Sequence, residues 1–241
     1  MIFLIFLLGL VAGTLSAISW GAGLIVAPAL MLLWLPPQAA IATSKFAGVW
    51  NALWAIAKFW KEKKIIWKIA LPLCIFAVIG GYLWAHIVIS IDARTLSIII
   101  WVLLLVLLPI VLIGNIGVTQ KATSLIKKIL WSLIYFLLSI LGWFLGGLGP
   151  LYMANLMYFY GLDIVQANAT DIIPYFVLTV TSVIVLISQW FLDRKIWITL
   201  FLGMMIWGYV GAHLAIKKWN KRVKTVFAIV VVASAIKILF F

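Results

Sequence analysis

Long apolar stretches recur along the whole chain, separated by short segments that are basic, polar or rich in glycine and proline. A stretch of about twenty apolar residues is long enough to cross the ~30 Å hydrocarbon core of a bilayer as an α-helix. Polar and apolar positions do not alternate as they do in the strands of a membrane barrel. The pattern therefore predicts helical segments near 2–19, 23–35, 38–59, 65–89 and 95–114, and again near 129–145, 149–160, 163–191, 195–216 and 221–240.

The second segment of each half is too short to cross a bilayer of ordinary thickness. A broken helix at membrane depth leaves backbone groups without partners, which is tolerated only against protein or a water-filled cavity. We therefore expect both breaks to face the interior of the fold. The glycine-rich breaks are Gly21-Ala22-Gly23 and Gly146-Gly147-Leu148-Gly149-Pro150, and the turns that end these segments are Pro36-Pro37 and Gly161-Leu162-Asp163.

The composition agrees with this pattern, because 67% of the residues are hydrophobic and 10% are charged. An ordinary soluble domain has roughly a quarter of its residues charged. The chain is therefore predicted to be an all-α polytopic membrane protein, with the lipid bilayer as its main partner. A formal net charge of +13 would suit nucleic acid, but the lysines lie in short clusters between apolar spans, as in cytoplasmic loops. A nucleic-acid partner is not expected.

Sequence motifs of enzymes are missing, so we do not expect an enzyme. There is no glycine-rich phosphate loop ending in Gly-Lys-Ser/Thr, and the only glutamate, Glu62, sits in a lysine-rich loop. Asp163 precedes an apolar segment and is expected to cap a helix rather than to form a catalytic pair with Asp171. His86 and His213 fall near the ends of their segments, too far apart to share a metal, and no cofactor is expected.

Two short patterns occur twice in the chain. Residues 81–86 share glycine, tyrosine and histidine with residues 208–213, and the same offset aligns residues 40–43 with residues 167–170. Duplicated hydrophobic units are a common architecture of transporters, in which the substrate binds where the repeats meet. We divide the chain into a first transmembrane repeat (1–114), a cytoplasmic linker (115–128) and a second transmembrane repeat (129–241).

The loop charges indicate how the repeats are oriented. The loop after the third segment is strongly basic in the first half and nearly balanced in the second. The loop after the fourth segment reverses this bias, with Asp92 and Arg94 in the first half and a lysine-rich stretch at 217–224 in the second. Equivalent loops of opposite bias should lie on opposite sides of the membrane. We therefore predict inverted repeats, and parallel repeats are the alternative if one short segment is re-entrant.

Asp171 and Lys45 are the charged residues expected at membrane depth. Asp171 lies about two turns into the third segment of the second half, and its counterpart, Ser44, precedes Lys45. Intramembrane charges usually face a cavity or a partner. Across a pseudo-two-fold axis the two charges approach each other or share a central site, as a coupling acid and a lysine that attracts an anion. The structural alternatives are a buried pair that holds the halves in register, or a lysine that extends to the membrane surface.

Hydroxyl and amide groups accumulate near the two breaks. An oxyanion needs several such donors, together with backbone N–H groups at helix N-termini such as those that follow Gly23 and Gly149. The alternative is that serine and threonine only join membrane helices to each other. The candidate donors are Thr43, Ser44, Asn51, Gln166, Asn168 and Thr170.

The order of these motifs resembles the sulfite exporter TauE/SafE family. The resemblance lies in residues 19–30 (SWGAGLIVAPAL) and 36–44 (PPQAAIATS), with a degraded copy in residues 146–149 and 161–171. It implies a secondary transporter of small anions, among them sulfite and organosulfonates, in the cytoplasmic membrane. By the resemblance, the first half-site would be lined by Gly21, Gly23, Pro28, Thr43 and Ser44, and the second by Gly147, Gly149 and Thr170.

Two departures from the family pattern bear on the substrate. Ala22 stands where a third glycine is common, and Asp171 stands where the repeated motif has serine. An acid at that place repels an anion unless it is protonated or paired with Lys45. Our leading hypothesis is a proton-linked oxyanion carrier in which Asp171 is the coupling residue. The alternatives are a cation or metal carrier that uses Asp171 as a ligand, and a membrane scaffold subunit that transports nothing.

Overall fold

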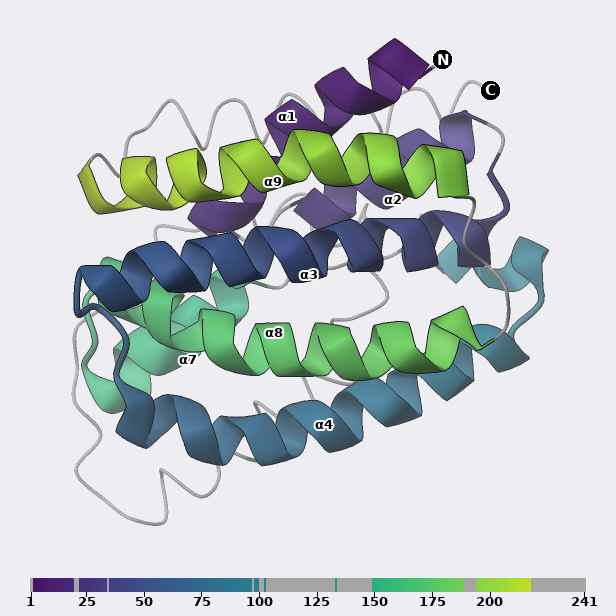
Figure 1. The fold of residues 1–241 in the computed structure, drawn as a ribbon. Coiled ribbons are helices and arrows are strands. Elements are labelled where there is room, and N and C mark those ends of the chain that lie inside the picture. The colour runs from purple at the N-terminus through teal and green to yellow at the C-terminus, as the bar shows by residue number, and fades with distance from the viewer. Residues whose placement is uncertain are drawn as a thin grey trace.

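The computed structural model describes residues 2–19, 22–33, 35–96, 98–99, 102, 133, 149–188 and 194–217. Within these ranges every regular element is a helix, so the all-α class is confirmed for this part of the chain. The helices are α1 (Ile2–Ser19), α2 (Ala22–Leu32), α3 (Pro37–Lys61), α4 (Trp67–Ser90), α7 (Gly149–Tyr160), α8 (Ile164–Ile187) and α9 (Arg194–Lys217), as shown in Figure 1.

The predicted segments agree with the helices of the structure to within a few residues. Helix α3 continues beyond the predicted end to Lys61, and an ion pair between Lys58 Nζ and Glu62 Oε1 at 2.7 Å stabilises this last turn. Nearly all of segment 95–114 lies outside the described residues, as do the linker 115–128, nearly all of segment 129–145 and the whole of segment 221–240.

Asp163 caps helix α8, as predicted. Its Oδ1 atom accepts hydrogen bonds from the backbone N–H groups of Val165 and Gln166, both at 2.9 Å. In return, Gln166 Oε1 accepts a hydrogen bond from Asp163 N at 3.4 Å. This reciprocal capping box satisfies donors that would otherwise be unpaired at the start of the helix. The Oε1 atom of Gln166, a residue expected to supply a donor for a substrate, is therefore used as an acceptor in the helix start.

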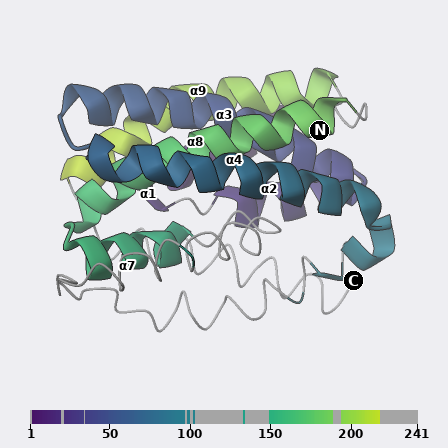
Figure 2. The ribbon, with the colours of Figure 1, turned by 90° about the horizontal axis from the view of Figure 1, so that it is seen from below.

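The long helices α9, α3, α8 and α4 lie side by side in that order and form a layer (Figure 1). Helices α3 and α9 run in one direction along this layer, and α8 and α4 run in the other (Figure 1). Helix α1 packs against α9. The short helices α2 and α7 lie behind the layer, α2 in contact with α3 and α7 in contact with α8 (Figure 2).

Helices α1 and α9 approach each other closely because glycines line their contact. A Cβ atom at Gly9 would lie 2.8 Å from the carbonyl oxygen of Leu200. One at Gly203 would lie 2.7 Å from the carbonyl oxygen of Phe6. Small residues allow membrane helices to pack backbone against backbone in this way.

Asn51 joins α3 to the pair formed by α1 and α9. Its Nδ2 atom donates to Gly13 O at 3.0 Å and to Met204 O at 3.1 Å. One buried amide thus binds a carbonyl on each of two other helices. Asn51 is one of the candidate substrate donors of the sequence analysis, and its Nδ2 is occupied by these helix contacts.

A second close contact joins α4 to α8. A Cβ atom at Gly81 would lie 2.7 Å from Leu178 O, and Ser182 Oγ donates to Gly81 O at 3.2 Å. Close backbone-to-backbone contacts therefore occur at both sides of the layer, between α1 and α9 and between α4 and α8.

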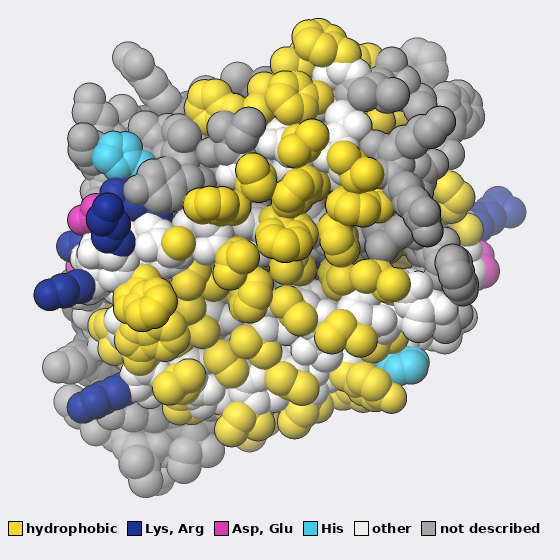
Figure 3. Space-filling view, viewed as in Figure 1, with side chains coloured by type: hydrophobic (Ala, Val, Ile, Leu, Met, Phe, Trp, Pro, Cys, Tyr) yellow, Lys and Arg dark blue, Asp and Glu magenta, His cyan; other side chains and the backbone are white. Residues whose placement is uncertain are grey.

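The outer surface of the described helices is strongly apolar between two ends that carry charges (Figure 3). Large apolar side chains exposed on this surface include Trp54, Ile75 and Ile184. Soluble proteins rarely expose so continuous an apolar surface. Among the described residues, two helices, Trp67–Ser90 and Val165–Ile187, are long and apolar enough to cross a membrane. This surface is that of a membrane protein.

Candidate functional site

The second turn of α8 carries the polar residues predicted for the second half-site. Asn168 and Thr170 are fully buried, and Asp171 is 2% exposed. The hydroxyl of Thr170 accepts a hydrogen bond from Ile66 N at 3.2 Å. Ile66 is the cap residue of α4, and its own side chain makes no capping hydrogen bond. Thr170 therefore supports the start of α4, a role that its sequence position alone does not reveal.

The equivalent turn of α3 carries Thr43, Ser44 and Lys45, all of them buried. Thr43 Oγ1 has no hydrogen-bond partner among the described residues. Lys45 is 6% exposed, and its Nζ lies 5.2 Å from the centroid of the Trp84 ring of α4. This distance is within the range of a cation–π interaction. The turn thus buries a lysine and a hydroxyl group, on different faces of the helix because residues two apart do not face each other.

Helices α3 and α8 cross near their middles. A Cβ atom at Gly48 would lie 3.1 Å from the hydroxyl oxygen of Tyr175, so the tyrosine side chain reaches the backbone of α3 at this point. Lys45 lies one turn before Gly48, and Asp171 lies one turn before Tyr175. The two helices are antiparallel. Lys45 and Asp171 therefore lie on opposite sides of the crossing along the layer.

Lys45 and Asp171 are separated by this geometry rather than brought together. Thr170, the neighbour of Asp171, contacts the start of α4 at Ile66, whereas Lys45 contacts Trp84 near the other end of α4. At about 1.5 Å per residue, about 27 Å of helix separates Ile66 from Trp84. These contacts favour two separate positions along the layer over a direct approach, which is one of the arrangements considered from the sequence.

The short helices contribute one further buried polar group. Pro28 is buried within α2, and Asn155 is buried within α7. Asn155 Nδ2 has no hydrogen-bond partner among the described residues. The sequence analysis missed Asn155, although an amide within a short apolar helix was the available signal. Of the predicted glycines, Gly23 lies in the first turn of α2 and Gly149 opens α7, whereas Gly21 and Gly147 lie outside the described residues.

Gln38 also has a structural role that the sequence does not disclose. Its Nε2 donates to Ile91 O at 3.0 Å and so joins the start of α3 to the end of α4. The same end of α4 carries Trp84, the ring beneath Lys45. The position of that ring relative to α3 is therefore fixed by a hydrogen bond as well as by apolar contacts.

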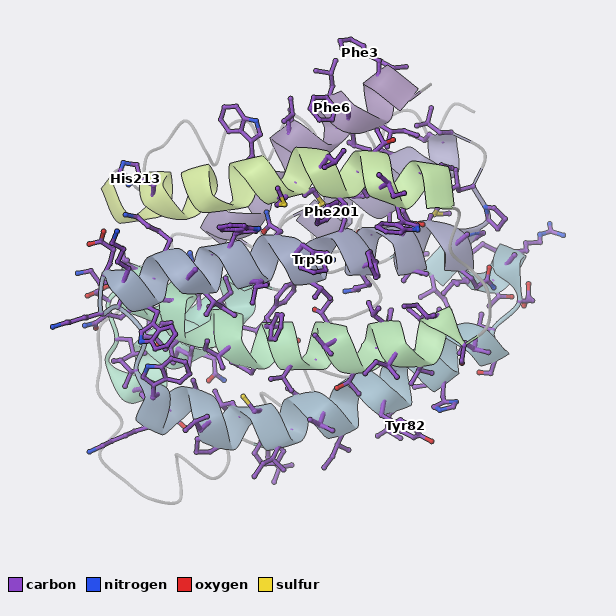
Figure 4. All side chains as sticks on the ribbon, in the orientation of Figure 1. Phe3, Phe6, Trp50, Tyr82, Phe201 and His213 are labelled. Atoms are coloured by element: carbon purple, nitrogen blue, oxygen red, sulfur yellow. The ribbon has the colours of Figure 1, made fainter. Side chains whose placement is uncertain are left out.

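The two histidines lie at opposite ends of the molecule, as expected (Figure 3). His213 is on α9 at the end where α3 and α4 are joined (Figure 4). Over the described ranges, no group of three or more His, Cys, Asp and Glu side chains is placed to hold a metal ion.

Comparisons with known proteins place these observations in a family. The model of the family described as sulfite exporter TauE/SafE matches residues 5–238. A Sinorhizobium protein named "Probable membrane transporter protein ORF9" is 24% identical over 240 residues, 98% of this chain and 91% of the relative. "Probable membrane transporter protein YdhB" of Bacillus subtilis is 26% identical over 218 residues, 88% of this chain and 87% of the relative. No solved structure matches the chain.

Proposed function

Because the chain belongs to the sulfite exporter TauE/SafE family of membrane transporters, we propose that it moves a small oxyanion, such as sulfite or an organosulfonate. The proposed process is proton-linked export across the cytoplasmic membrane by a multi-pass carrier. The substrate site would lie where the two repeats meet and would open to each side in turn.

The observation that carries this proposal is the set of buried donors on α3 and α7. The Thr43 hydroxyl and the Asn155 amide have no hydrogen-bond partners for their Oγ1 and Nδ2 atoms in the described part of the chain. A buried polar group without a hydrogen-bond partner lowers the stability of the folded protein by about 1–3 kcal/mol. An oxyanion accepts hydrogen bonds from hydroxyl, amide and ammonium groups alike, so Thr43 and Lys45 on α3 and Asn155 on α7 are each candidate donors, at different positions along the layer.

Inverted repeats are supported by the directions and the contacts of the helices. The sequence offset makes α3 equivalent to α8 and α4 equivalent to α9, and each equivalent pair runs antiparallel (Figure 1). Helix α4 packs on α8, and α9 packs on α3, which is the same contact with the repeats exchanged. A two-fold axis in the membrane plane relates repeats of this kind.

One pair of equivalent residues supports the same axis. Asn51 of α3 and Leu178 of α8 match under the sequence offset. Asn51 contacts Met204 of α9, and Leu178 contacts Gly81 of α4. Equivalent residues of the two repeats therefore contact equivalent helices, α9 for Asn51 and α4 for Leu178.

Asp171 is the residue that we assign to proton coupling. It is buried in the second turn of α8, about 10 Å along the helix from its start. Acidic residues at such depth in a membrane usually serve transport or proton transfer. Because Lys45 lies toward the other end of α4, Asp171 does not have to face the anion that Lys45 attracts. In this arrangement Asp171 would not repel the substrate.

The lysine-rich end of the layer is proposed to face the cytoplasm. Lys61, Lys63 and Lys64 lie in or next to the connection from α3 to α4, and Asp92 and Arg94 lie beyond the other end of α4. Cytoplasmic loops of membrane proteins carry an excess of lysine and arginine. In this orientation Asp171 is nearer the cytoplasm and Lys45 is nearer the outside.

Transport of labelled sulfite by proteoliposomes tests the substrate class. We expect uptake above that of empty liposomes, with competition by methanesulfonate. Lys45→Met should lower the rate about 10–100-fold, because it removes a charge-assisted hydrogen bond worth about 1.5–3 kcal/mol. Lys68→Met, at an exposed lysine, is the matched control and should leave the rate unchanged. An absence of flux for both sulfite and sulfonates, with the protein folded, would contradict the proposed substrate class.

A further inference from the structure

A pocket opens at the lysine-rich end of the layer, where α3 turns into α4. Its volume is about 280 Å³, and it is lined by Trp60, Lys61, Lys63, Ile65 and Trp67. Ile65 is buried and forms an apolar wall, whereas both lysines are exposed. The pocket therefore combines an apolar interior with cationic side chains that reach solvent.

The turn that builds this pocket is held in one conformation. Lys63 adopts a left-handed backbone conformation with φ 52°, and its N–H donates to Trp60 O at 2.9 Å. Lys64 N donates to Phe59 O at 3.0 Å, which closes the end of α3. The rings of Trp60 and Trp67 then meet edge to face, with centroids 6.2 Å apart. The walls of the pocket are thus in place before any ligand binds.

The charge around the pocket is positive and is not neutralised by the nearby acid. Glu62 is the only acidic residue of the turn, and it forms an ion pair with Lys58 at 2.7 Å. The hydrogen bond from Lys58 lowers the pKa of Glu62, so this carboxylate stays ionised and bound to Lys58. Lys61 and Lys63 therefore supply two positive charges to the mouth of the pocket.

An apolar stripe runs from the pocket along the outer face of α4. Trp67, Leu71, Ile75 and Ile79 follow one another at intervals of one helical turn and are all exposed, Ile75 to 64%. Residues four apart share a face of a helix. The stripe extends from the lysine-rich end into the apolar surface that faces lipid in the proposed orientation.

We propose that this pocket binds the phosphate headgroup of an anionic phospholipid, whose acyl chain lies along the stripe on α4. Lysines near a membrane surface attract anionic headgroups, and tryptophan is enriched at the same depth. A free phosphate ion would use the lysines but would gain nothing from the stripe. The bound lipid would stabilise the corner of α3 and α4, next to the contact between Ile66 and Thr170.

Native mass spectrometry of the purified full chain in detergent tests the site. Phosphatidylglycerol and phosphatidylcholine with the same acyl chains are compared on the wild-type protein and on two double variants. Lys61→Gln/Lys63→Gln removes the lysines that line the pocket, and Lys64→Gln/Lys68→Gln removes the same charge from the same segment outside it. Thermal unfolding confirms that each variant is folded.

We expect phosphatidylglycerol to bind the wild type more tightly than phosphatidylcholine does. The pocket variant should weaken phosphatidylglycerol binding about thirtyfold, and the matched control should weaken it much less. Equal losses in the two variants would overturn the proposal, because they would indicate diffuse attraction to the whole segment. Displacement of phosphatidylglycerol by an equal concentration of inorganic phosphate would also overturn it, because the site would then belong to a free anion.

Discussion

Replacing Thr43 with valine should raise the stability of the protein and lower its rate of transport. The exchange substitutes a methyl group for a hydroxyl in a fully buried position and changes the shape of the side chain very little. Thr43 Oγ1 has no hydrogen-bond partner among the described residues, so the folded protein bears a desolvation cost of about 1–3 kcal/mol there. We therefore expect Thr43→Val to be more stable by about 1 kcal/mol and to transport sulfite more slowly.

Thermal unfolding in detergent measures the first effect, and proteoliposome uptake measures the second. A change of 1 kcal/mol moves the Tm of a protein of this size by about 2–4 °C. Thr170→Val is the matched control, because its hydroxyl accepts a hydrogen bond from Ile66 N. Its loss leaves a backbone donor unpaired and should lower stability by about 1–3 kcal/mol. The same substitution is thus expected to raise the stability of the protein at Thr43 and to lower it at the equivalent Thr170.

The opposite result at Thr43 would refute the reasoning. If Thr43→Val lowered the Tm as Thr170→Val does and left sulfite uptake unchanged, the hydroxyl would serve the fold and not a substrate.

Three further predictions concern stability. Gly81→Ala should destabilise the protein by about 1–3 kcal/mol in thermal unfolding, because its Cβ would lie 2.7 Å from Leu178 O. Asp163→Ala removes the capping box of α8 and should cost about 1 kcal/mol in the same assay, whereas Asp163→Asn should retain most of it. Hydrogen bonds from Thr95, and more weakly from Arg94, lower the pKa of Asp92 in the folded state. The stabilisation by Asp92 is therefore present above the unfolded-state pKa and is lost as the pH falls through the folded-state pKa. The Tm difference between the wild type and Asp92→Asn should accordingly shrink on acidification.

A control variant and a contradicting result can be stated for these stability predictions. Gly48→Ala is the control for Gly81, since the atom nearest its added Cβ is the hydroxyl oxygen of the Tyr175 side chain, at 3.1 Å, and not a backbone atom. Equal losses at Gly48 and Gly81 would show that backbone contact is not the cause. A Tm difference for Asp92→Asn that grows at low pH would show that the sign of its linkage is wrong.

Local features of the fold were predictable from the sequence because they depend on neighbouring residues. The apolar spans located the described helices, and the Asp163 cap followed from its position before such a span. Contacts between helices were not predictable in the same way. The hydrogen bond from Ile66 N to Thr170 and the position of Lys45 over Trp84 join residues far apart in the chain. Nothing in the local pattern distinguishes Thr170, which has this partner, from its equivalent Thr43.

The contacts of the described helices favour separate positions for Lys45 and Asp171 over a direct approach, for a geometric reason. Both residues lie at a similar depth from the start of their own helix. In antiparallel helices, however, equal depth places residues toward opposite ends. Side chains on helices also lean toward the helix N-terminus, which moves the two charges further from the crossing at Gly48.

If Asp171 links sulfite movement to protons, the response of transport to a proton gradient should depend on its carboxyl group. Initial sulfite uptake is measured in proteoliposomes with and without an imposed proton gradient, for the wild type and for Asp171→Asn. We expect the gradient to stimulate uptake by the wild type, whereas the folded variant should transport at a rate that the gradient does not change. A variant that keeps the stimulation of the wild type would contradict the assignment of Asp171 as the coupling residue.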